Sequence, residues 1–143
     1  MRGLAGDREG AIDAMNDALS LDESNIAALN YIGYTYAEEG RELDEAERLI
    51  RKALVLSPLD PAILDSLGWV LFKQGKHAQA LELLLEADRQ APDEPEILEH
   101  IAACHAALGE QAKAVEILKR ALGLKPQPWV RERLEKALQE LGE

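Results

Sequence analysis

The sequence predicts an all-α fold, a right-handed superhelical solenoid of antiparallel helix pairs in a single domain of 143 residues. Three residue types recur along it at intervals of 34 or 35 positions. The series are Ala11, Ala46, Ala80 and Ala114; Gly6, Gly40, Gly75 and Gly109; and Pro58, Pro92 and Pro126. This interval is typical of arrays of helix–turn–helix units. Because such an array stacks its units side by side, we expect it to present a long binding surface rather than to enclose a reaction.

The first element, residues 1–25, is predicted to be an N-terminal half repeat. We expect Met1–Ala5 to form only the end of one helix and Asp7–Ser20 to form the next helix. Ile12, Met15 and Leu19 give this second helix an apolar stripe. In a complete repeat a partner helix would bury part of the stripe. We therefore expect these three residues to be available for self-association, and the chain to be a piece of a longer protein or to be covered there by another chain.

Three complete repeats follow, predicted at residues 26–60, 61–94 and 95–127. In the second of them, Asp60 is suited to cap a helix whose first residue is Pro61, because proline has no N–H to leave unpaired there. Gly75 can take the left-handed conformation that ends a helix. Small residues at Gly68 and Ala80 indicate that the two helices cross closely. The first complete repeat is one residue longer than the others, near Arg41–Asp44, which we place in the turn between its helices.

The last element, residues 128–143, is predicted to be a capping helix. Its apolar side carries Val130, Leu134, Leu138 and Leu141, and its other side is charged, with Arg131, Glu132, Glu135, Lys136 and Glu140. Natural arrays need such polar-faced ends. The charged side is therefore expected to face solvent.

These residues together resemble the tetratricopeptide repeat family over nearly the whole chain. The first copy of the pattern reads Leu29, Ile32-Gly33, Tyr36, Gly40, Ala46, Ile50, Ala53 and Pro58; the second reads Leu64, Leu67-Gly68, Leu71, Gly75, Ala80, Leu84, Ala87 and Pro92; and the third reads Leu98, Ile101-Ala102, His105, Gly109, Ala114, Leu118, Ala121 and Pro126. The third copy departs from the pattern at Ala102 and His105. The resemblance implies that the first helix of each repeat lines a concave groove that binds a peptide.

Mapping this groove by register gives Asn30, Tyr34, Glu38, Asp65, Trp69, Phe72, Lys73 and Glu99. For Phe72, packing between repeats is an equally good interpretation, whereas for Trp69 we favour an accessible groove position. Carboxylates at Asp65 and Glu99 would repel a peptide carboxylate, which excludes the carboxylate-clamp mode known in this family. The expected partner is a protein or peptide that is basic or apolar.

The composition excludes several other functions. A net charge of −11 argues against nucleic-acid binding, which needs a basic surface, and no apolar run is long enough to span a membrane. His100 and Cys104 share a helix face beside His105, but two ligands make a weak metal site, and Cys104 and His105 fall at packing positions. We therefore expect no metal, no cofactor and no enzymatic activity. The single cysteine can form no internal disulfide.

The sequence thus favours a protein-interaction scaffold or adaptor. An alternative is an assembly module that self-associates, as a homodimer for example, or docks through its uncapped N-terminal end. The block Pro61–Ala87 also resembles repeats of bacterial envelope adaptors, which implies a bacterial protein of the cytoplasm or of the periplasm and envelope. The sequence does not choose between these compartments.

Overall fold

The computed structural model describes residues 4–142, with side chains from residue 9 onward. Within these residues the chain forms helices and no strand, which confirms the predicted fold class. The helices are α1 (Leu4–Leu21), α2 (Ile26–Glu39), α3 (Leu43–Leu56), α4 (Pro61–Lys73), α5 (His77–Gln90), α6 (Pro95–Ala107), α7 (Gln111–Gly123) and α8 (Pro128–Glu140).

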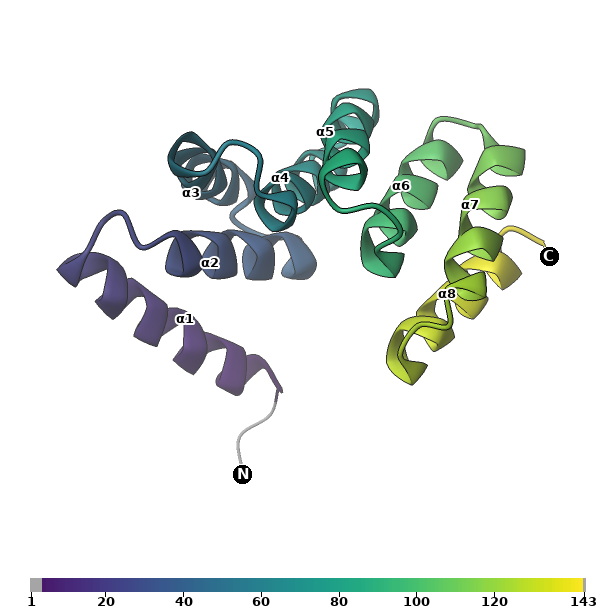
Figure 1. The fold of residues 1–143 in the computed structure, drawn as a ribbon. Coiled ribbons are helices and arrows are strands. Elements are labelled where there is room, and N and C mark those ends of the chain that lie inside the picture. The colour runs from purple at the N-terminus through teal and green to yellow at the C-terminus, as the bar shows by residue number, and fades with distance from the viewer. Residues whose placement is uncertain (1–3, 143) are drawn as a thin grey trace.

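The helices stack as successive antiparallel pairs into a superhelical arch (Figure 1). Helices α2 and α3, α4 and α5, and α6 and α7 pair most extensively. Helix α2 also contacts α4, α4 contacts α6, and α6 contacts α8. No Cα atom of α3, α5 or α7 lies within 8 Å of a Cα atom in another of these three helices. Helices α2, α4, α6 and α8 therefore form the inner layer of the arch, and α3, α5 and α7 form its outer layer.

Local capping interactions explain where the inner helices begin and end. The side chains of Asn25 and Asp60 accept hydrogen bonds from backbone N–H groups in the first turns of α2 and α4. After α4, Gly75 has a φ of 86°, a left-handed conformation that costs glycine little. The extra residue of the first complete repeat lies in the turn between α2 and α3, as predicted. Glu42 there takes a φ of 52°.

Small residues allow the two helices of a repeat to cross closely. A Cβ atom added at Gly68 would lie 2.7 Å from Cγ of Leu84 and 3.3 Å from the carbonyl oxygen of Ala80. A Cβ at Gly33 would similarly clash with the side chain of Ile50. The periodic alanines Ala46, Ala80 and Ala114 are fully buried. The repeating small residues of the sequence are thus the contact points between helices.

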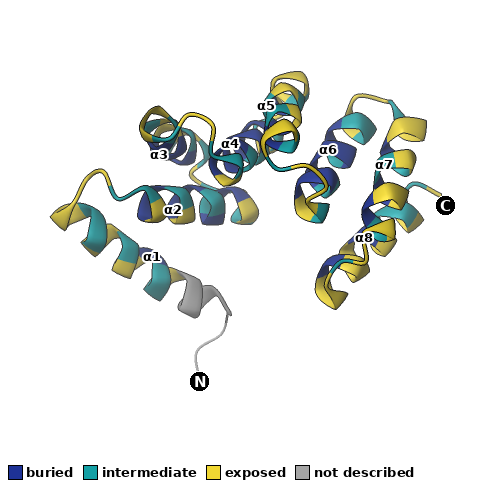
Figure 2. Ribbon diagram, viewed as in Figure 1, coloured by how far each residue is buried: buried dark blue, intermediate teal, exposed yellow. Residues whose placement is uncertain are grey.

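The core runs between the two layers along the whole arch, and Figure 2 shows its buried residues on the facing sides of the helices. At the C-terminal end Val130 and Leu134 of α8 are buried against this core, as the sequence predicted for the capping helix. Leu138 and Leu141 are half-buried beside them.

The N-terminal element differs from the prediction. Leu4 and Ala5 already belong to α1, so they do not end a preceding helix, and Gly6 lies inside α1 rather than in a turn. A helix can continue through glycine at a cost of about 1 kcal/mol, and no proline stops it here. The expectation for Met1–Gly3 lies outside the described residues.

Ile12 is also not available at the surface, because it packs into the core with only 3% of its surface exposed. Met15 and Leu19 are half-buried against the same core. Helix α1 therefore covers the end of the array with part of the apolar stripe that was expected to remain open.

Candidate functional site: an acidic inner groove

Three adjoining cavities lie along the inner layer, and together we call them the inner groove. The alanine cavity, about 170 Å³, is lined by Trp69, Glu99, Ala102, Ala103, Ala106, Leu118, Ala137, Glu140 and Leu141. The middle cavity, about 150 Å³, is lined by Tyr34, Glu38, Trp69, Glu99, His100 and Arg133. The wide cavity, about 380 Å³, is lined by Tyr31, Tyr34, Thr35, Glu38, Glu96, Trp129 and Arg133. Shared residues join each cavity to the next.

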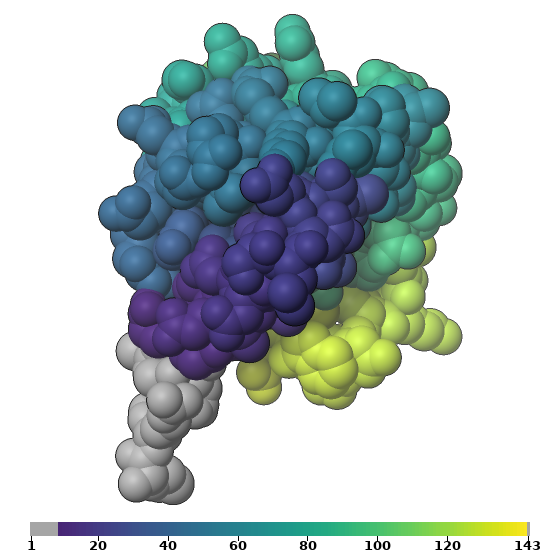
Figure 3. Space-filling view, turned by 90° about the vertical axis from the view of Figure 1, so that its left-hand side faces the viewer, coloured from purple at the N-terminus to yellow at the C-terminus, as the bar shows by residue number. Residues whose placement is uncertain are grey.

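The wide cavity spans the groove from α2 to α8. In Figure 3 helix α8, in yellow, lies below the N-terminal helices, with a recess between the two parts. Trp129 on α8 is 60% exposed, and Tyr31 on α2 is 38% exposed. The helix at the C-terminal end of the array therefore forms one wall of the groove.

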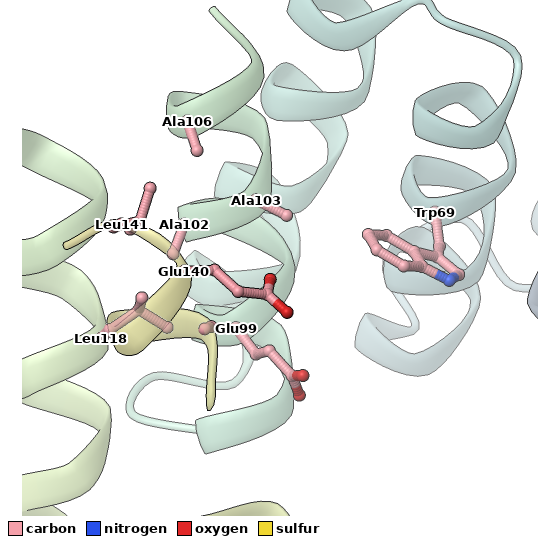
Figure 4. A pocket seen from close by; sticks show the side chains of 9 residues that line it. Trp69, Glu99, Ala102, Ala103, Ala106, Leu118, Glu140 and Leu141 are labelled. Atoms are coloured by element: carbon pink, nitrogen blue, oxygen red, sulfur yellow. The ribbon is translucent and has the colours of Figure 1, made fainter. Parts of the chain in front are cut away.

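Trp69 separates the alanine cavity from the middle cavity. Its ring stacks on Phe72 with 4.7 Å between centroids and on His100 with 4.1 Å between centroids. The Nζ atom of Lys73 lies 5.1 Å from the centre of the indole. In Figure 4 the carboxylates of Glu99 and Glu140 are directed towards the space that Trp69 borders from the other side. Stacking fixes the indole, while part of its surface remains accessible from the groove.

Beneath Trp69, a buried ion pair joins two neighbouring repeats. Nδ1 of His100 on α6 lies 2.7 Å from Oδ1 of Asp65 on α4, and His100 is only 5% exposed. Burial lowers the pKa of His100, but the charge of Asp65 and the hydrogen bond to it outweigh this effect, so the pKa is raised above its ordinary value. Asp65 is therefore committed to His100, and it lines none of the three cavities.

A second ion pair closes the groove on the side of α8. The Arg133 guanidinium donates to both carboxylate oxygens of Glu99, at 2.9 to 3.2 Å, and lies 3.9 Å from Glu96. The side chain of Arg133 is 47% exposed, whereas that of Glu99 is only 19% exposed. Arg133 thus lies at the junction of the middle and wide cavities, where it partly neutralises the carboxylates of the groove.

Tyr34 adds a hydrogen-bond donor to the same junction. Burial, the charge of Glu38 and a hydrogen bond to Glu38 raise the pKa of the Tyr34 hydroxyl well above its ordinary value. The phenol therefore stays protonated at neutral pH and donates to the Glu38 carboxylate. Glu38 itself is exposed and lines both cavities.

The structure brings together four of the predicted groove residues, Tyr34, Glu38, Trp69 and Glu99. Lys73 and Phe72 pack on the indole and line none of the three cavities, and Phe72 also contacts the ring of His77. Asn30 is half-buried and lines none of the three cavities.

The sequence analysis missed Tyr31 and Thr35 of α2, Glu96 of α6 and the lining residues of α8. Arg133 follows Glu99 by 34 positions, one full period of the array, so the same register extended by one step would have placed it in the groove. Assigning the charged side of α8 wholly to solvent obscured this signal. Glu140, from the same charged set, lines the alanine cavity.

The remaining candidate residues, Cys104 and His105, make contacts that belong to the fold. Cys104 is fully buried, and burial raises the pKa of its thiol to about 12. Nδ1 of His105 lies 3.1 Å from Glu110 at the end of α6. Among the residues that the structure describes, no three His, Cys, Asp or Glu side chains are grouped so that they could hold a metal ion. In the same part of the chain, no helix is both long and apolar enough to cross a membrane.

Comparison with known proteins decides the family. The tetratricopeptide repeat family matches residues 5–61 and 66–127, which is most of the chain. This protein is a tetratricopeptide repeat (TPR) protein. A TPR repeat-containing protein of Pseudomonas aeruginosa is 43% identical over 83 residues, which are 58% of this chain and 14% of that protein. Anaphase-promoting complex subunit 3 of Dictyostelium discoideum is 28% identical over 109 residues, 76% of this chain and 11% of that protein.

Solved TPR structures share the fold. A thermophilic TPR protein of Thermus thermophilus superposes with a TM-score of 0.84 at 23% identity, covering 96% of this chain and 76% of that one. A crystal structure of MamA gives a TM-score of 0.70 at 25% identity, covering 85% and 71%. The chain spans less than a sixth of the length of the two curated relatives. The family and its structural neighbours support a protein-interaction scaffold in general, and the Pseudomonas relative agrees with a bacterial origin.

Proposed function

We propose that this TPR protein is a non-enzymatic scaffold or adaptor that holds a peptide segment of a partner protein in its inner groove. The observation that carries the proposal is the run of three joined cavities along the inner helices, with Trp69 between two of them. Partly exposed aromatic rings in a groove are common anchors for a partner side chain.

The charge of the groove supports a basic or apolar partner. The carboxylates that line the three cavities are those of Glu38, Glu96, Glu99 and Glu140, and Arg133 is the only Lys or Arg side chain among these lining residues. With a net charge of −11 the chain repels nucleic-acid phosphates. A peptide with an excess of positive charge is attracted to this groove, and its charge complements the carboxylates there.

The proposal is tested by selecting peptides from a random displayed library on the whole chain. We expect Glu99→Lys to weaken the binding of the selected peptides by about tenfold and Trp69→Ala to weaken it by about 2 kcal/mol or more. Isothermal titration measures both affinities, and circular dichroism confirms that each variant is folded.

The matched control is Glu116→Lys, the same charge change at an exposed position of the outer helix α7. It should leave affinity unchanged. Selected peptides that respond to Glu116→Lys and ignore both groove variants would place binding on the outer face and contradict the proposal.

A second candidate function is assembly through the N-terminal end. Helix α1 packs mainly on α2, Leu19 also borders a cavity with Leu49 of α3, and Met15 and Leu19 are only half-buried. The exposed Leu21, with 91% of its surface accessible, extends the same end. We propose that another copy of the chain, or a preceding helical segment, packs there.

A further inference from the structure

The middle and alanine cavities share Trp69 and Glu99, but they differ in chemistry. The alanine cavity is floored by Ala102, Ala103 and Ala106, and its volume of about 170 Å³ has room for one apolar side chain. The middle cavity is bounded by the carboxylates of Glu38 and Glu99. An apolar site and an anionic site therefore lie next to each other with one common wall.

The anionic site already binds a cationic group from the protein itself. The guanidinium of Arg133 lies between the middle and wide cavities and contacts both oxygens of Glu99. This fork-like contact is the geometry by which arginine recognises a carboxylate. The site thus has the charge and the shape to accept a guanidinium.

Arg133 can leave this site because water is available to solvate its guanidinium. Its side chain is 47% exposed, and exposed ion pairs contribute little because water and salt screen them. The side chain of Glu99, in contrast, is mostly buried, and a buried carboxylate without a cation beside it is costly. The charge of Glu99 therefore depends on a neighbouring cation more than the exposed charge of Arg133 depends on Glu99. Replacement of Arg133 at Glu99 by a cation of the ligand therefore costs little free energy.

We propose that the groove recognises an apolar side chain and a basic side chain lying side by side in the partner peptide, and that the basic group replaces Arg133 at Glu99. This inference rests on the proposed function and specifies its ligand. The apolar side chain fills the alanine cavity against Trp69. Arg133 acts as an internal competitor until the partner arrives.

The probe is a seven-residue peptide, blocked at both ends, with one leucine and one arginine two positions apart among glycine and serine. In an extended peptide, side chains two positions apart lie on the same face. Titration into the ¹⁵N-labelled chain, followed by NMR, should shift the indole N–H signal of Trp69 and the amide of Ala103. Replacing the arginine of the peptide by glutamine, or its leucine by serine, should weaken binding by about tenfold.

The variant Arg133→Gln should bind the arginine peptide about threefold more tightly, because the competitor is gone. Its matched control is Arg131→Gln, the same charge change at an exposed residue of α8 that does not line the groove, and it should bind as the parent does. In Glu99→Gln the preference for the arginine peptide over its glutamine analogue should disappear. This last comparison keeps the test decisive even if Arg133→Gln loosens α8.

Equal affinity of the arginine and glutamine peptides, or an equal gain in Arg131→Gln and Arg133→Gln, would overturn the inference. So would the absence of shifts at Trp69 and Ala103 at millimolar peptide. Each of these results leaves the proposed groove function intact if library-selected peptides still lose affinity in Glu99→Lys. If the selected peptides respond only to outer-face changes, the proposed function itself fails.

Discussion

At the scale of single residues, the repeat register predicted which residues line the groove better than it predicted which side chains contact each other. Trp69 lines the groove, as do Tyr34 and Ala103, which occupy the same register position one period before and one period after it. The sequence did not reveal that Asp65 would be withdrawn from the groove by His100. The two residues are 35 positions apart on adjacent helices, and their contact depends on side-chain conformations and on burial, which periodicity does not encode.

The Asp65–His100 pair should make stability depend on pH. Because the folded pKa of His100 is raised above its ordinary value of about 6.5, the protonated pair stabilises the fold fully below that pH. The stabilisation then decreases as the pH rises through the folded pKa. The imidazolium is also near Glu99 of its own helix and Glu38 of α2, which favour the same charge state, whereas Arg133 of α8 lines the same cavity and opposes it.

We therefore expect His100→Gln to lower the free energy of unfolding by about 1–3 kcal/mol at pH 6 and by less at pH 9. Urea unfolding of both proteins at several pH values between these limits measures the difference. The other ionisable groups are common to both proteins, so their contributions cancel to a first approximation. A difference that is constant with pH would show that folding leaves the pKa of His100 unchanged, and would contradict the prediction.

At the scale of helices, the sequence was informative wherever a local rule decides the outcome. The N-cap at Asp60 and the left-handed glycine at Gly75 lie where predicted, because both effects depend on a few neighbouring residues. The prediction was wrong at Gly6, where α1 continues. The periodic glycine suggested a turn there, but a glycine ends a helix only when the following chain leaves the helical path.

The close crossing of α4 and α5 gives a test at this scale. Gly68→Ala adds a Cβ that meets Leu84 and the backbone of Ala80, so we expect a loss of about 1–3 kcal/mol of stability from overpacking. Gly123→Ala is the control, because its Cβ would meet nothing within 4 Å and alanine favours a helix by up to about 1 kcal/mol. Thermal unfolding should thus move in opposite directions in the two variants. Equal shifts would show that helix propensity, not the crossing, dominates at Gly68.

At the scale of the whole molecule, the sequence predicted an arch with a concave face, but it did not predict that the groove has a wall at its far side. Its far wall is formed by α8, a helix assigned from its charged residues to solvent. Trp129 and Arg133 reach the groove because α8 occupies the position of an inner helix after three complete pairs. The predicted repeat boundaries and the self-association of the N-terminal end remain predictions.

Association through that end is expected to depend on concentration. Covering the accessible parts of Met15 and Leu19 and the exposed Leu21 gains about 25 cal/mol per Å² of apolar surface. We expect sedimentation velocity to show a dimer that increases with concentration, and Met15→Ser with Leu19→Ser to shift it towards monomer. The same two substitutions should not affect binding in the groove. A strict monomer at all concentrations would remove the assembly function from consideration.

The fully buried thiol of Cys104 can be used to measure how fast the array opens. With a pKa of about 12 and no accessible surface, this side chain reacts with a disulfide reagent only when α6 separates from its neighbours. Since Cys104 is the only cysteine of the chain, the rate of labelling reports that single event without engineering. A ligand bound in the groove, which α4, α6 and α8 line together, should slow the reaction in proportion to its occupancy, whereas urea far below the unfolding midpoint should accelerate it.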